Sequence, residues 1–259
     1  MSAELLTHEI RQRRVGAGAL AVIIAAFGVL ALGIAEAIGG LLDDITAGFP
    51  ESLGAFLGAD SPGGYVTGEM FNLVFPIAVV AFAVIVGASA LAGEERDGTM
   101  AMLSAQPVSR TRVLWAKAGG VALALVAVVG LNWVGMAGFI TSGATALTLA
   151  GLTGGTVHLL SLGLAFAAIA FAVSAATGRP SVGSSTAGGI AVVAYLTATM
   201  LPIAGLESWA RLSPWYYYLG RSAPLSNGLN LADLGVFTAV IAVCMALAVL
   251  TYRRRDLKG

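Results

Sequence analysis

The chain has 259 residues, of which 58% are hydrophobic and 11% are charged, and its mean hydropathy is +0.88. Soluble domains average about 45–50% apolar and about 25% charged residues, so the composition excludes a soluble protein. The net charge is zero, and the single cysteine, Cys244, excludes an internal disulfide and a cysteine-based metal site. Lipid must therefore be the solvent for most of the chain.

Six apolar blocks follow one another along the chain, and each has the roughly 20 residues that a helix needs to cross a bilayer. Stretches within them are apolar on every face, whereas the strands of a membrane barrel alternate apolar and polar residues. The sequence therefore predicts an all-α integral membrane protein with one domain over residues 1–259. The predicted spans are 15–42, 71–93, 114–140, 152–176, 182–203 and 231–252.

The segment before the first span, residues 2–14, has a modest amphipathic pattern in which Leu5, Leu6 and Ile10 share one side. This pattern predicts a helix that lies in the membrane interface. Two alternatives stay open. One is a disordered start with a basic stop, and the other is a cleaved signal peptide, although the apolar run is longer than the 7–15 residues of a signal core.

Lysine and arginine are distributed unequally between the two sides of the predicted membrane domain. With the N-terminus inside, twelve basic residues lie on the inner side, and the outer side holds only Arg211 and Arg221. Positive charge is retained in the cytoplasm, so both termini are expected there. The first outer segment, Asp43 to Glu69, has five acidic residues and no basic one, which agrees with this topology.

The segment between the second and third spans is the most informative part of the sequence. Gly98 can end the incoming helix, Thr99 can cap a new one, and Pro107 stops it. Met100 and Leu103 would share a face of this short helix and form an apolar patch between acidic and basic residues. We expect such a patch to bind another protein, whereas an ordinary charged hairpin would explain the charges but not the ordered turn residues.

This segment resembles the membrane subunits of type-two ABC exporters, whose pattern is E-E-x-x-G-T-x-x-x-L-x-x-x-P-V-S-R. Weaker matches are the S-P-x-Y segment at Ser213 and the basic end, Tyr252 to Asp256. The resemblance implies a coupling helix that contacts a separate ATPase subunit, with two permeases and two ATPases in one transporter. The matching residues and their neighbours in this segment are Glu94, Glu95, Gly98, Thr99, Met100, Leu103, Pro107, Val108, Ser109 and Arg110, followed by Lys117.

The same resemblance implies where cargo would pass. In similar exporters the second and fifth spans of two permeases face each other, and short re-entrant helices join the fifth and sixth spans on the outer side. Pro202, Pro214 and Pro224 are compatible with broken helices in that stretch. The candidate path residues are Phe71, Asn72, Phe75, Tyr195, Thr197 and Thr199, although the phenylalanines could instead face lipid and Asn72 could bond to a neighbouring helix.

The sequence gives little support for nucleotide binding, metal binding or catalysis by this chain. Neither Lys117 nor Lys258 ends a P-loop, and neither His8 nor His158 belongs to a zinc-binding helix. Glu36 falls near the outer interface, where it is more easily hydrated than at the midplane, and His158 is expected near the outer end of the fourth span. No catalytic, metal-binding or cofactor residue is therefore predicted on this chain, and no nucleic-acid partner is expected.

The sequence thus predicts a permease subunit of an ATP-driven exporter in a bacterial inner membrane, with ATP and Mg²⁺ bound by the partner ATPase. The expected partners are two ATPase subunits, a second copy or a homologous permease, membrane lipid, and a hydrophobic or amphipathic cargo. The main alternative is a self-contained secondary carrier or channel. An intramembrane hydrolase is disfavoured because histidine and carboxylate partners are missing from the spans.

Overall fold

The computed structural model describes residues 15–35, 37, 48, 68–96, 109–142 and 146–255, with residues 94–96 described by their backbone only. All regular structure within these ranges is helical, which confirms the all-α prediction. The predicted interfacial helix over 2–14 and the predicted coupling helix lie outside the described residues. Beyond the first span, Val15–Ala35, the elements are η1 (Met70–Val74), α4 (Phe75–Arg96), α6 (Arg110–Ile140), α7 (Leu149–Thr177), α8 (Pro180–Ile203), α9 (Glu207–Ala210), η2 (Tyr216–Gly220), α10 (Pro224–Asn227) and α11 (Leu231–Arg254).

Six of these helices are long and apolar enough to cross a membrane, as predicted. Three of them begin two to four residues before the predicted apolar blocks, because polar residues or proline start these helices. Ser109 caps α6 and Thr148 caps α7, each accepting a backbone N–H of the first turn, while Pro180 occupies the first position of α8. The last helix, α11, also runs two residues past the predicted end. The first span is described as helix to Ala35 and again at residue 37.

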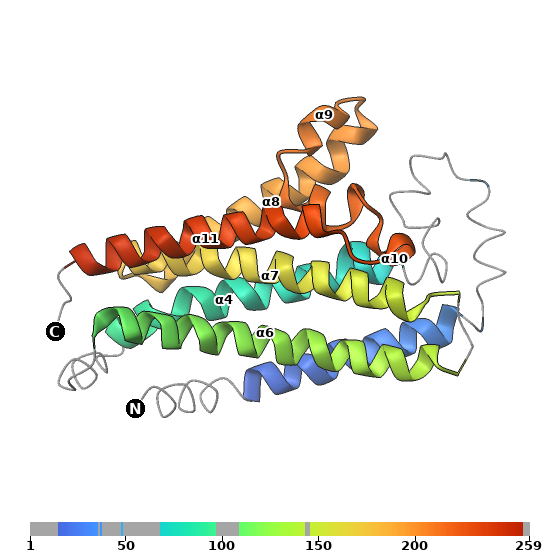
Figure 1. The fold of residues 1–259 in the computed structure, drawn as a ribbon, viewed down its shortest axis with the longest axis horizontal. Coiled ribbons are helices and arrows are strands. Elements are labelled where there is room, and N and C mark those ends of the chain that lie inside the picture. Colours follow the sequence, from blue (N-terminus) through green and yellow to red (C-terminus); the bar gives the residue numbers. More distant parts are fainter. Residues whose placement is uncertain are drawn as a thin grey trace.

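The helix α7 lies at the centre of the bundle and contacts α4, α6, α8 and α11 (Figure 1). Small residues allow the backbones to approach closely, as is typical of helices packed in lipid. A Cβ atom added at Gly87 of α4 would lie 2.5 Å from the carbonyl oxygen of Ala167 in α7. One added at Gly163 would lie 2.8 Å from Val79 Cγ1. Glycine is therefore required where α4 crosses α7.

The first span packs beside α6 (Figure 1). A Cβ atom at Gly28 would lie 2.7 Å from Asn132 Oδ1 of α6, and one at Gly135 would lie 3.6 Å from Ala25 Cβ. Asn132 is fully buried, and neither atom of its amide has a hydrogen-bond partner in the described part of the chain. The small residues again bring two helices close together.

Three short helices connect α8 to α11, in the stretch where broken helices were predicted. Pro202 lies in the last turn of α8, Pro214 precedes η2, and Pro224 begins α10. Figure 1 shows α9 projecting from the side of the bundle, whereas α10 lies against α7. That these helices dip back into the bilayer from the outer side stays a prediction.

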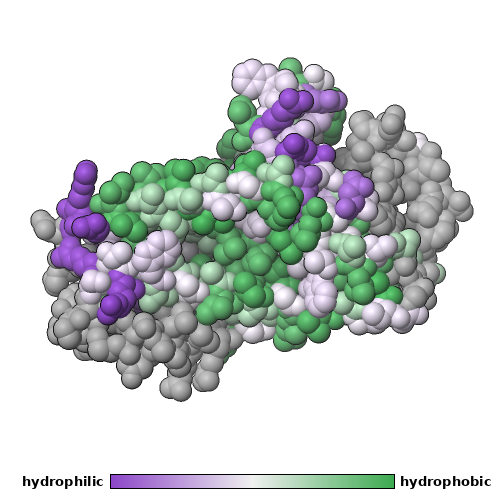
Figure 2. Space-filling view, in the orientation of Figure 1, coloured by the Kyte–Doolittle hydropathy of each residue, from purple (hydrophilic) through white to green (hydrophobic). Residues whose placement is uncertain are grey.

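The surface has the polarity of a protein embedded in lipid. Figure 2 shows hydrophobic residues over the middle of the molecule and hydrophilic residues gathered at the end where α11 terminates and around the short helices. Large apolar side chains are exposed on the spans, among them Trp115, Val193 and Leu247. Such exposure is unfavourable in water and favourable in a bilayer. The protein is therefore a multi-pass membrane protein.

Candidate functional site

The predicted coupling segment joins two helices at one end of the bundle. The helix α4 ends at Arg96 and α6 begins at Arg110, so residues 97–108 connect neighbouring helix ends. Glu94 and Glu95 lie in the last turn of α4. The remaining predicted coupling residues lie outside the described residues, and these are Gly98, Thr99, Met100, Leu103 and Pro107.

The two described residues that close this segment have defined roles. Ser109 is the N-cap of α6, and its hydroxyl accepts the backbone N–H of Arg112 at 3.4 Å. Arg110 follows as the first residue of the helix, is exposed, and donates through Nη1 to the carbonyl oxygen of Arg255 at 2.9 Å. The structure thus brings Arg110, the last residue of the P-V-S-R motif, against Arg255 at the end of α11, although the two are separated by 145 residues.

Arg255 also contacts the end of a third helix. Its Nη1 donates to the carbonyl oxygen of Ala175 at 2.8 Å, in the last turn of α7. That helix ends at Gly178, which is left-handed with φ 69° and whose N–H bonds to the carbonyl of Ser174. We call the group of Arg110, Ala175, Gly178 and Arg255 the arginine junction. It ties together the start of α6 and the ends of α7 and α11.

The predicted path residues of the second span lie partly inside the protomer. Phe71 and Phe75 are fully buried, and their rings form an edge-to-face pair with centroids 5.2 Å apart. The carbonyl oxygen of Phe71 accepts a hydrogen bond from the hydroxyl of Tyr218 at 2.8 Å. Asn72 is half-buried next to them. The two rings therefore pack in the core of the single chain and face neither lipid nor an open cavity of the protomer.

The predicted path residues of the fifth span are more accessible. Tyr195 stacks edge-to-face on Trp215 with ring centroids 5.6 Å apart, which joins α8 to the segment before η2. The hydroxyls of Thr197 and Thr199 donate to carbonyls of their own helix, at 2.7 Å and 2.9 Å. Such bonds satisfy a hydroxyl in lipid while leaving its oxygen free to accept another hydrogen bond.

A groove of about 690 Å³ runs along α8, and Thr197 lines it. Gly189, Val193 and Leu201 contribute to its floor from α8, and Trp209 and Leu212 contribute from the segment around α9. Its surface is mostly apolar with a few hydroxyls. Thr197 alone among the predicted path residues lines this groove. The sequence of α8 has no marked amphipathic pattern that shows which face is left uncovered.

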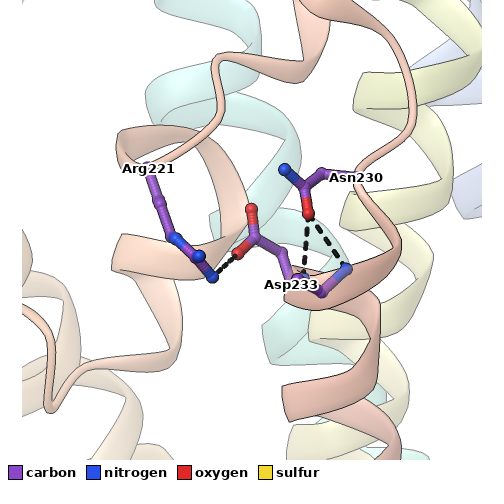
Figure 3. Close-up of polar contacts among 4 residues, drawn as sticks. Arg221, Asn230 and Asp233 are labelled. Atoms are coloured by element: carbon purple, nitrogen blue, oxygen red, sulfur yellow. Dashed lines mark hydrogen bonds and ion pairs between the residues drawn. The ribbon is translucent and has the colours of Figure 1, made fainter.

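An ion pair links the short helices to the last span. Arg221 Nη1 lies 2.8 Å from Asp233 Oδ1, and the Asp233 side chain is fully buried whereas that of Arg221 is 44% exposed (Figure 3). Asn230 caps α11 by accepting the N–H groups of Ala232 and Asp233. Sequence analysis missed Asp233, which lies in the last predicted span. The capping spacing of Asn230 and Asp233 was the available signal.

Two further polar residues, Lys117 and His158, are buried within the spans. Lys117 is 3% exposed on α6. His158 is fully buried about 14 Å along α7 from Leu149, and its place near the outer end of the fourth span stays a prediction. Its Nδ1 lies 2.8 Å from the carbonyl oxygen of Gly154. No group of three His, Cys, Asp or Glu side chains suited to a metal ion occurs among the described residues.

Comparison with known proteins supplies the family. No curated protein matches the sequence. A family model described as ABC-2 family transporter protein matches residues 4–257, which is nearly the whole chain. The six apolar helices agree with a membrane component rather than an ATPase. The chain therefore belongs to the ABC-2 family of transporter proteins, the membrane subunits of ABC transporters.

Proposed function

We propose that this chain is the permease subunit of an ATP-driven exporter and that it binds a separate ATPase through residues 94–110. The observation that carries the proposal is the position of this segment, which connects α4 to α6 at the basic end of the bundle in a chain that has no P-loop. Positive residues mark the cytoplasmic side, where ATP is available. The family and the E-E-x-x-G-T pattern support the same assignment.

The groove on α8 supports pairing of two permeases. It lies on the fifth span, which in similar exporters faces the partner permease, and Val193 and Trp209 are 65% and 58% exposed there. A second copy or a homologous permease would cover this surface and enclose a path that is apolar with hydroxyl groups such as that of Thr197. Such a lining suits a hydrophobic or amphipathic cargo. Phe71 and Phe75 shape this path only indirectly, because they are buried.

The self-contained carrier or channel remains the second candidate. Carriers driven by ions place ionisable side chains near the midplane of their spans. Among the described residues, the carboxylates of the spans lie only in end turns, since Glu94 and Glu95 belong to the last turn of α4 and Asp233 to the first turn of α11. The imidazole of His158 lies farther along its helix and bonds to the backbone carbonyl of Gly154. The structure therefore favours an energy source on another subunit.

The coupling role is tested by co-expression with the product of a neighbouring reading frame that carries the sequence motifs of an ABC ATPase. Replacing Met100 and Leu103 by aspartate places charge in the proposed contact, which costs several kcal/mol of binding free energy. We expect loss of ATPase co-purification while the chain stays helical and monodisperse. Ala105→Asp is the matched control, because residue 105 falls on the opposite face of the predicted coupling helix. Unchanged co-purification with the double variant would exclude this contact.

The pairing role is tested by filling the groove. A Cβ atom at Gly189 has no neighbour within 4 Å, so Gly189→Leu should leave the protomer folded while obstructing the partner. The control is Gly235→Leu on α11, which is also exposed and has equally open space around its Cβ position. We expect only the variant at 189 to reduce pulldown of a differently tagged second copy. Equal retention of the second copy by both variants would rule out pairing through α8.

A further inference from the structure

We propose that Arg255 is a positioning residue that transmits displacement of the start of α6 to the turn between α7 and α8, and so to the groove of the fifth span. This inference rests on the proposed function. Arg255 uses two separate groups for the connection. Its carbonyl oxygen accepts a hydrogen bond from Arg110, the first residue of α6, and its guanidinium donates to the carbonyl of Ala175 in α7.

The guanidinium occupies a position that suits a cation. The last carbonyl groups of a helix lack intrahelical partners and carry the negative end of the helix dipole. Arg255 satisfies one of them at Ala175. The backbone of Arg255 is itself held, because its N–H donates to the carbonyl of Thr251 at the end of α11. The arginine is therefore fixed by its main chain to α11 while its side chain holds α7.

Gly178 makes room for this side chain. A Cβ atom at Gly178 would collide with the Arg255 guanidinium, and the φ of 69° is one that other residues rarely adopt. Glycine thus serves two purposes here: it ends α7 in the left-handed conformation and it leaves space for the arginine. Any larger residue at 178 would displace the guanidinium.

The turn beside Arg255 leads directly into the groove helix. Arg179 is the N-cap of α8 and Pro180 is its first residue, so only Gly178 and Arg179 separate the two helices. A connection this short, with proline fixing the start of α8, transmits a displacement better than a long flexible loop. Force applied at the start of α6 therefore has a continuous route, through Arg110 and Arg255, to α8.

The test measures movement of α8 directly. Val193 lines the groove and is 65% exposed, so it is replaced by cysteine after Cys244 is changed to serine. The complex of permease and ATPase is reconstituted in proteoliposomes, and its labelling by N-ethylmaleimide is timed with and without ATP and vanadate. We expect nucleotide to change the labelling rate at position 193. In Arg255→Ala this nucleotide effect should fall by at least about twofold, with ATPase co-purification retained.

Two controls distinguish the effect of disrupting the arginine junction from the effects of losing a positive charge and of straining the backbone. Arg254→Ala removes an exposed arginine one residue earlier, and the nucleotide effect should persist. Gly178→Ala should reduce the nucleotide effect on labelling as Arg255→Ala does. It therefore provides a second test if Arg255→Ala folds poorly. Gly205→Ala carries the same strain, at φ 74°, with no atom within 4 Å of the added Cβ, and should keep the effect.

The outcomes distinguish this inference from the proposed function. If the unmodified permease does not bind the ATPase, the proposed function is wrong. If the ATPase binds but nucleotide never alters labelling at position 193, or if Arg255→Ala and Gly178→Ala both keep the full nucleotide effect, the transmission through Arg255 is wrong while the permease assignment stands.

Discussion

The consecutive helices α7 and α8 have similar composition and opposite surroundings. Within the most apolar part of each helix, 67% of residues are buried inside the protomer in α7 and 17% in α8. Glycine shows the difference most clearly. A Cβ atom at Gly154 of α7 would meet the backbone of Pro224 and Gly228, whereas one at Gly188 or Gly189 of α8 would meet no atom within 4 Å. The α7 glycine permits packing within the chain, and the α8 glycines leave a surface open.

The largest effect is expected where α7 meets α10. A Cβ atom in Gly154→Ala would lie 2.6 Å from the carbonyl oxygen of Pro224, and backbone cannot rotate away as a side chain can. Overpacking of this kind costs about 3 kcal/mol of unfolding free energy. Denaturant unfolding of the purified protein in detergent measures the cost. If the free energy of unfolding falls by less than it does for ordinary surface substitutions, α7 is not the tightly packed centre of the bundle.

A smaller effect is expected at the ion pair between the linker after α8 and the last span. Arg221→Met leaves the fully buried carboxylate of Asp233 without its partner. Removing one partner of a buried pair is strongly destabilising, and because Arg221 is 44% exposed and water can replace part of the contact, we expect about 2 kcal/mol. Thermal unfolding measures it, with Arg211→Met at an exposed arginine of the same linker as control. Equal losses in both variants would contradict a specific role for the pair.

Hydropathy predicted the six spans because lipid requires about 20 apolar residues for every crossing, and this requirement is visible in any window of the sequence. Three helices start before their predicted first residues. Ser109, Thr148 and Pro180 start them through local hydrogen bonds and a fixed backbone dihedral, which an average of hydropathy does not detect. The different burial of α7 and α8 could not be predicted, because neither helix has a marked amphipathic pattern that would separate a buried face from an open one.

The candidate site could be predicted from the sequence only where local residues determine the structure. The motif ending at Arg110 predicted the end of the segment between α4 and α6, since turn and capping residues have local signatures. Its contact with Arg255 depends on how helices distant in sequence pack together, and the bond from Arg255 to Ala175 spans 80 residues. Phe71 and Phe75 were expected to line a path and lie in the core instead, because a helical repeat shows which residues share a face but not what that face contacts.

A modest gain in stability is expected on the open face of α8. Gly188→Ala replaces a flexible residue by the best helix former, and its Cβ atom would meet no atom within 4 Å. The change should raise the unfolding free energy of the protomer by up to about 1 kcal/mol. The comparison with Gly154→Ala in the same denaturant assay is decisive, since the same substitution should have opposite signs in α7 and α8. A loss of stability at position 188 would mean that α8 is packed within the protomer.

The smallest expected effect is a pH dependence at Glu69, which precedes η1 and whose charge acts on Tyr195 of α8. Partial burial raises the pKa of the Glu69 carboxyl above its ordinary value of 4.5. Folding therefore favours the protonated form, so the stabilisation is present below pH 4.5 and is lost as the pH rises through the raised pKa. Glu69→Gln cannot ionise and should lose less stability than the parent chain over that interval. Melting temperatures of both chains at a series of pH values above 4.5 measure the difference. Parallel curves would show that water hydrates the carboxylate at position 69 as fully as in the unfolded chain.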